Sequence, residues 1–192
     1  MAHPLLLLVF IHNDLSDYDR EKIYNDHFKW LGKELETLSG RGVAIVLIEP
    51  SKAPRLCDHG YKLGTPEQAL YSWHEKIERY KDDYSNDAFA TYNDHTRKVL
   101  LLTRDNLSDT VAGIASHKGY FAIASINSTQ TPAHEVGHMF GALHEDFEVY
   151  HNGWWDETIM ARGSIESSLR RNAKRFSDKN RENIRQYLAE YA

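Results

Sequence analysis

The chain has 192 residues, of which 41% are hydrophobic and 27% are charged. These proportions are ordinary for a globular protein, and the length fits one domain with an adequate core. The formal net charge of −5 gives no reason to expect binding to nucleic acid or to an anionic membrane. The longest apolar run, Leu5–Ile11, is far too short to span a bilayer, so we expect no membrane insertion.

The apolar pattern predicts strands that alternate with helices. We expect strands at Leu5–Ile11, Val43–Glu49, Lys98–Leu102 and Tyr120–Ser125. We expect helices at Tyr18–Leu38, from the capping box at Thr65–Gln68 to Lys81, from Thr131-Pro132 onward, and at Asp178–Tyr191 after a Ser177 cap. Such alternation predicts an α/β (α+β) fold, in which helices pack on a twisted mixed sheet.

Cysteine usage restricts the covalent chemistry of the chain. Cys57 is the single cysteine, so no intramolecular disulfide can form. This fits a reducing compartment or a bacterial secreted protein without disulfides, and the localisation stays open. We favour an inert buried thiol for Cys57, and we expect a monomer.

One stretch carries a specific chemical pattern. Residues 134–144 read HEVGHMFGALH, which places three histidines, one glutamate and one glycine at the spacing HExxHxxGxxH. Residues four apart share one face of a helix, so His134 and His138 can both reach one metal ion. Gly141 allows a backbone turn, after which His144 can return as a third nitrogen ligand.

This ligand set predicts a catalytic rather than a structural metal site. Three protein ligands leave the fourth tetrahedral position open, which is typical of one catalytic Zn²⁺ ion. Glu135 is displaced around the helix from His134, so it is suited to act as the general base on a zinc-activated water. The chain contains 11 histidines, and a chance match is the alternative, but five residues at fixed offsets favour the metal site.

The motif resembles that of the metzincin metallopeptidases, and a second segment adds to the resemblance. Metzincins carry a methionine in a tight turn beneath the metal, and Thr158-Ile159-Met160 lies at a suitable distance after His144. The resemblance implies that Met160 forms an apolar floor under the imidazoles. A core methionine is the ordinary alternative.

The chain is most similar to the adamalysin/reprolysin-like branch. Residues 99–105 (VLLLTRD), followed by Gly113-Ile114-Ala115, resemble the stretch that precedes the zinc helix in that branch. Phe176-Ser177 and Tyr187-Leu188 resemble its closing helix. Glu145 follows the third histidine where adamalysins have aspartate, and the disulfides of that branch are absent.

The resemblance also implies how substrate binds. In metzincins an edge strand before the zinc helix holds an extended substrate by main-chain hydrogen bonds. We expect this edge to be the strand formed by Tyr120, Phe121, Ala122, Ile123 and Ala124. We also expect one catalytic domain over residues 1–192, with an upper subdomain to about Gly141 and a small lower subdomain from Ala142 that ends in a helix.

The sequence therefore predicts a zinc-dependent endopeptidase that acts on a protein or peptide substrate. Two alternatives stay open. The chain could be a zinc-binding recognition module without activity, although neither Glu135 nor any of the three histidines is replaced. It could also be a specialised effector or toxin protease with one host target.

Overall fold

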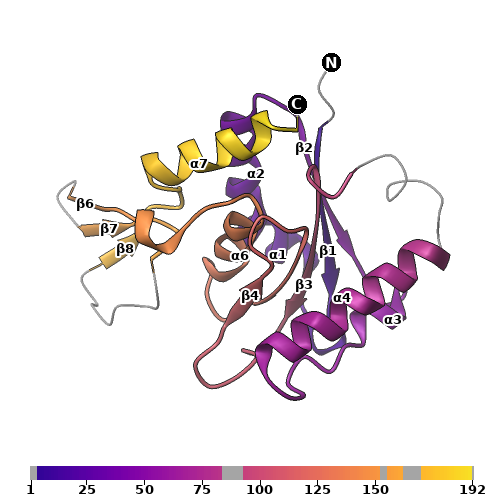
Figure 1. Cartoon of the computed structure of the whole chain (residues 1–192). Helices are drawn as coiled ribbons and strands as arrows, with labels where there is room; N and C mark the ends of the chain where they lie inside the picture. The colour runs from indigo at the N-terminus through magenta and orange to yellow at the C-terminus, as the bar shows by residue number, and fades with distance from the viewer. Residues whose placement is uncertain (1–3, 84–92, 152–154, 162–169, 192) are drawn as a thin grey trace.

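A computed structural model describes residues 4–83, 93–151, 155–161 and 170–191. Its centre is a five-stranded sheet in the order β2-β1-β3-β5-β4 (Figure 1). The strands are β1 (Leu5–Ile11), β2 (Val43–Ile48), β3 (Arg97–Thr103), β4 (Gly113–Ala115) and β5 (Phe121–Ser125). Neighbouring strands are parallel except β4, which pairs with β5 in the antiparallel sense. The predicted mixed sheet is confirmed.

Helices cover both faces of the sheet because successive side chains of each strand point in opposite directions. Leu5, Leu7 and Val9 of β1 pack in one core with residues of α2 (Lys29–Ser39), α6 (Thr131–Met139) and α7 (Asp178–Ala189). The alternate residues of β1 pack in a second core with α3 (Pro54–Cys57) and α4 (Pro66–Asp83). The predicted metal helix, α6, therefore lies on the α2 and α7 face, opposite α4 (Figure 1).

The helix predicted at Tyr18–Leu38 is divided into three segments. It begins as α1 (Arg20–Ile23), capped by the Asp19 side chain, continues as a π-helical segment at Tyr24–Phe28, and ends as α2. Gly40 follows the last residue of α2 with a φ of 65°, the left-handed conformation in which glycine commonly ends a helix.

The predicted starts of α4, α6 and α7 are confirmed, and a side-chain cap is present at two of them. The capping box is present before α4, where the Gln68 side chain accepts from Thr65 N and the Thr65 hydroxyl accepts from Gln68 N. Ser177 caps α7 by accepting from Asn180 N. Thr131 differs, because it lies in the first turn of α6 and no side-chain cap bond is made there.

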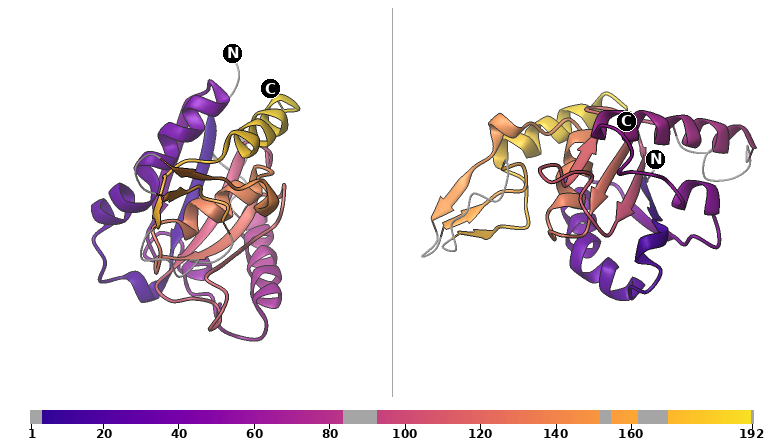
Figure 2. Two further views of the ribbon diagram at one scale, coloured as in Figure 1. Left: turned by 90° about the vertical axis from the view of Figure 1, so that its left-hand side faces the viewer. Right: turned by 90° about the horizontal axis from the view of Figure 1, so that it is seen from below.

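A second, small sheet was not predicted from the sequence. It contains β6 (Val149–His151), β7 (Trp155–Glu157) and β8 (Arg170–Asn172). Figure 2 shows it projecting beyond the main sheet at the end where α7 begins. Its strands have three residues each, too few to give a sequence period, so the missed prediction has a simple cause.

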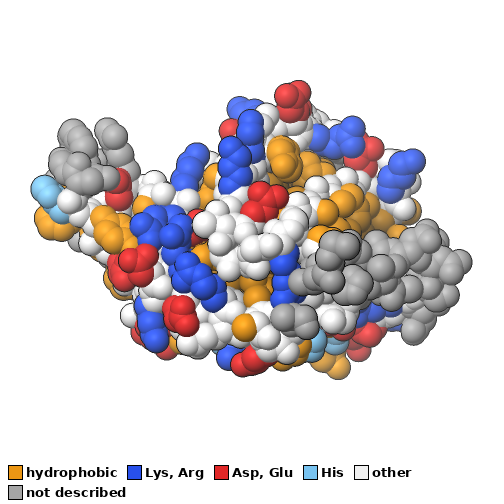
Figure 3. All heavy atoms as spheres, turned by 90° about the horizontal axis from the view of Figure 1, so that it is seen from above, with side chains coloured by type: hydrophobic (Ala, Val, Ile, Leu, Met, Phe, Trp, Pro, Cys, Tyr) orange, Lys and Arg blue, Asp and Glu red, His pale blue; other side chains and the backbone are white. Residues whose placement is uncertain are grey.

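The surface next to this small sheet carries mixed charge. Lys and Arg side chains gather there, interleaved with Asp and Glu (Figure 3). Arg175 forms an ion pair with Asp178 and lies over the Tyr150 ring, so this basic residue has an acidic neighbour.

Among the helices that the structure describes, none combines the length and apolar character that crossing a membrane requires.

Candidate metal centre

Helix α6 presents two of the predicted ligands on one face. His134 and His138 are separated by one helical turn, and their Nε2 atoms are 3.2 Å apart. His144 Nε2 lies 2.8 Å from His134 Nε2 and 3.1 Å from His138 Nε2. The three predicted histidines therefore form a compact group in which three ring nitrogens converge.

The turn after α6 brings His144 back to the helix. Gly141 has a φ of 90°, a left-handed conformation that favours glycine, and its N–H donates to the His138 carbonyl at 3.0 Å. Beyond the turn, Leu143 is bonded through both its N–H and its carbonyl to the side chain of Asn180 on α7. His144 follows directly, so its position depends on both the turn and α7.

Hydrogen bonds to carbonyls fix the tautomers of two of the rings. The Nδ1 atoms of His134 and His138 lie 2.9 Å and 3.0 Å from the carbonyl oxygens of Ile159 and Ala142. A carbonyl only accepts, so each Nδ1 carries the proton and each Nε2 presents a lone pair. Such bonds orient metal-ligating imidazoles in proteins.

Geometry and protonation both fit a zinc ion. Tetrahedral zinc with bonds of about 2.0–2.1 Å has nitrogen separations of about 3.3–3.4 Å, close to the spacings of these rings. Burial lowers the pKa of His134 to about 4 and that of His138 to about 3. Both rings are therefore neutral at neutral pH, which is the form that binds a metal ion.

Glu135 occupies a buried position beside the edge strand. Its side chain is 5% exposed, and burial raises the pKa of its carboxyl group to about 8. A Cβ added to Gly113 of β4 would lie 2.6 Å from Glu135 Oε1, so the carboxyl group packs directly on the backbone of that strand. No local sequence pattern indicates this contact, because it joins an edge strand to a helix 22 residues further along the chain.

Met160 lies beneath the centre of α6. Ile159 and Met160 occupy a turn closed by a 3.2 Å hydrogen bond from Ala161 N to the Thr158 carbonyl. Met160 is fully buried, and its sulfur would be 2.9 Å from a Cβ added to Gly137. Gly137 stands between His134 and His138 in α6, so the glycine makes room for the methionine below the helix.

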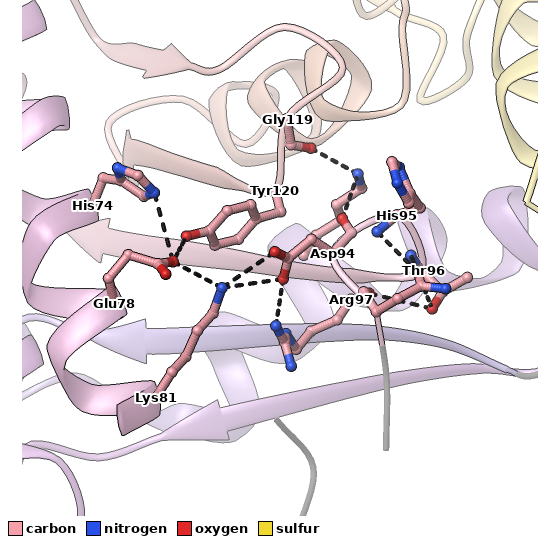
Figure 4. Close-up of polar contacts among 11 residues, drawn as sticks. His74, Glu78, Lys81, Asp94, His95, Thr96, Arg97, Gly119 and Tyr120 are labelled. Carbon is pink, nitrogen blue, oxygen red and sulfur yellow. Dashed lines mark hydrogen bonds and ion pairs between the residues drawn. The ribbon is translucent and has the colours of Figure 1, made fainter. Parts of the chain in front are cut away.

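The prediction that Tyr120–Ala124 form the sheet edge is wrong. Strand β5 lies between β3 and β4, and its backbone pairs on both sides. The Tyr120 hydroxyl donates to Glu78 of α4, as Figure 4 shows, and Phe121 stacks on His74 of the same helix. The remaining three side chains, Ala122, Ile123 and Ala124, are buried in the two cores.

The edge strand is β4, and its geometry leaves backbone groups available. Hydrogen bonds to β5 are made by the Ala112 carbonyl and by Ser116 N. Since alternate residues of an antiparallel strand face the same side, Gly113 and Ala115 direct their N–H and C=O groups outward. No other strand in the described part of the chain pairs with β4 on that side.

Cys57 lies away from the metal centre. It is buried in the core beneath α3 and α4, on the opposite face of the sheet from α6. Burial raises the pKa of its thiol to about 12, so the thiol stays protonated at neutral pH. The predicted inert role agrees with this position.

Comparison with known proteins supports the fold. The sequence matches no protein-family model and no curated protein. Among solved structures, the chain is similar to a zinc-dependent peptidase from Methanocorpusculum labreanum (strain Z). The TM-score is 0.52 and the sequence identity 18%, and the alignment covers 93% of this chain and 99% of that chain. The mixed α/β fold is thus one that a zinc-dependent peptidase also has.

Proposed function

We propose that the protein is a zinc-dependent endopeptidase of the metzincin type. The observation that carries this proposal is the convergence of three histidine Nε2 atoms beside a buried carboxyl group. The similar fold of the zinc-dependent peptidase from Methanocorpusculum labreanum supports it. The adamalysin-like branch remains a hypothesis that rests on the sequence resemblance.

His134, His138 and His144 would hold the metal through their Nε2 atoms. A bound Zn²⁺ ion supplies a Lewis acid that polarises the scissile carbonyl and lowers the pKa of water. The carbonyls of Ile159 and Ala142 keep the first two rings oriented. Met160 would support the site from below through the backbone beside Gly137.

Glu135 would move the proton during hydrolysis. As a carboxylate it accepts a proton from the attacking water, and as an acid it returns this proton to the leaving amine. Without metal, burial raises the pKa of the Glu135 carboxyl group to about 8, and the positive charge of a bound Zn²⁺ ion would favour the carboxylate again. A base of intermediate strength is suited to both transfers at neutral pH.

Strand β4 would align the substrate. An extended peptide can add to the outward groups of Gly113 and Ala115 as a further antiparallel strand. Because Gly113 packs on Glu135, the added strand passes directly beside the general base. An open strand edge accepts the interior of a polypeptide as readily as its end, which favours endopeptidase activity.

Metal analysis combined with cleavage of an unbiased peptide library tests the proposal. We expect about one zinc per chain, lost when all three histidines are changed to alanine. Glu135→Gln should keep the zinc and lose about 10²–10⁴-fold in cleavage rate. Glu36→Gln, an exposed carboxyl group on α2, is the matched control. Cleavage by Glu135→Gln at the wild-type rate would exclude this mechanism.

A further inference from the structure

The turn between β4 and β5 is exposed at its tip but fixed at its base. Gly119 N donates to the Ser116 carbonyl at 2.9 Å, which closes the turn. Lys118 N donates to the His138 carbonyl at 3.0 Å, which ties the turn to the metal helix. Lys118 adopts a φ of 54°, so the backbone at the tip is held in the left-handed region.

A buried lysine holds the same turn from inside. Lys98 is 0% exposed, and its ammonium group donates to the Gly119 carbonyl at 2.7 Å and to the Tyr187 hydroxyl at 2.8 Å. Figure 4 shows the Gly119 carbonyl as it accepts one of these bonds. Burying an ammonium group is costly unless several acceptors surround it. The position of this turn is therefore determined by contacts with β3, α6 and α7.

The tip presents two basic side chains. His117 and Lys118 are both exposed, and the His117 ring lies 6.3 Å from the ring of His138. In the described ranges, no side chain forms a hydrogen bond with the His117 ring, and no carboxylate pairs with the Lys118 ammonium. A fixed backbone thus displays two unpaired basic groups beside the metal centre.

The direction of β4 decides which part of a substrate would meet these groups. Gly113 lies at Glu135, and the turn that follows β4 lies at His138, so β4 runs alongside α6 in the same sense. An antiparallel substrate runs the other way. Its residues before the scissile bond therefore lie at the end of β4, toward His117.

We infer that His117 and Lys118 form a subsite for an acidic side chain on the amino-terminal side of the scissile bond, an inference that rests on the proposed peptidase function. His117 would supply an N–H donor and Lys118 a positive charge. Together they would favour aspartate or glutamate over the neutral amides. Neither residue is placed in the metal-binding or proton-transfer groups.

Matched peptides test this subsite. From a sequence cleaved in the library, pairs are made that differ only in Glu or Gln at each position before the scissile bond. At one position, wild type should cleave the Glu peptide with a kcat/KM about tenfold or more above that of the Gln peptide, the worth of one hydrogen bond to a charged group. The double variant His117→Ala/Lys118→Asn should reduce this ratio to near one. Asparagine tolerates the left-handed backbone of Lys118.

A binding measurement separates recognition from turnover. In zinc-loaded Glu135→Ala protein, fluorescence anisotropy should show tighter binding of the Glu peptide, and the double substitution should remove this difference. Lys52→Asn, beyond β2 at the opposite sheet edge, is the control for the loss of one positive charge. An unchanged Glu preference in the double variant, or no such preference in wild type, would overturn the subsite. Failure of wild type to cleave any library peptide would instead overturn the proposed function.

Discussion

The side chain of Asn180 forms two hydrogen bonds with the main chain of Leu143, the residue before His144. Asn180 Oδ1 accepts from Leu143 N at 2.7 Å, and Nδ2 donates to the Leu143 carbonyl at 2.9 Å. Asn180 is fully buried in the first turn of α7. Through this pair, the helix that follows the small sheet fixes the third histidine of the metal centre.

Removing this pair should weaken metal binding. Asn180→Ala leaves two main-chain groups of Leu143 without their partners, each at a cost of about 1–3 kcal/mol if buried. We expect zinc affinity to fall about 10–100-fold, as for other residues that orient metal ligands. A titration against a zinc chelator measures the change. Lys179→Ala, an exposed neighbour on α7, should bind zinc like wild type. Equal affinity of Asn180→Ala and wild type would show that His144 does not need this support.

A methyl group on β4 should disturb the general base. The Cβ of Gly113→Ala would lie 2.6–2.9 Å from the Glu135 side chain, so the carboxyl group must move. We expect full zinc content and a loss of at least about tenfold in kcat/KM, because small misplacements of catalytic groups are costly. In Gly42→Ala the new Cβ meets its nearest atom at 3.8 Å, which makes that variant the control. Wild-type turnover in Gly113→Ala would show that the added methyl group does not displace the Glu135 carboxyl group from its catalytic position.

Met160, which packs beneath α6, should tolerate an apolar substitution better than a charged one. Met160→Leu keeps apolar volume, so we expect near-normal zinc content and a stability loss under about 1.5 kcal/mol. Met160→Asp would bury a carboxyl group below the histidines, and we expect severe destabilisation. Urea unfolding and metal analysis measure both effects. If both variants were equally stable, Met160 would not be packed as this structure places it.

Lys98 should make the stability depend on pH. Burial lowers the pKa of its ammonium group from 10.5 to about 7 in the folded protein. Between these values the unfolded chain binds a proton that the folded chain has lost, so this group makes stability rise with pH. The free energy of unfolding of wild type minus that of Lys98→Met should rise from pH 7 toward 10, with a slope of up to about 1.4 kcal/mol per pH unit.

The free energies of unfolding are measured by urea unfolding of the metal-free proteins at several pH values. The same difference for Lys52→Met should be flat, because Lys52 is exposed. A flat difference for Lys98→Met as well would mean that Lys98 keeps its proton throughout the range.

The sequence was sufficient to predict the parts of the site that depend on short spacing. The helical repeat alone places His134 and His138 on one face of α6. The turn at Gly141 depends only on the φ angle of that one residue. Strand β1 was predicted correctly because a continuous apolar run of that length has few other stable arrangements.

Features that depend on distant pairing were missed. Strand β4 has three residues, so it lacks a period, and its place at the edge follows from the order of the whole sheet. The same order moves β5 into the interior. Lys98 was predicted at the start of a strand, but its burial depends on Gly119 and Tyr187, which no local pattern connects to it.

Because α7 holds the segment that carries His144, it also determines when the three histidines of a newly made chain come together. The ribosome releases α6 first, and its two histidines alone give an incomplete ligand set. Asn180 is synthesised later and must dock before the third imidazole is held in place. Under the proposed function, a nascent chain would therefore complete its set of three metal ligands only after α7 has folded onto the turn that carries His144.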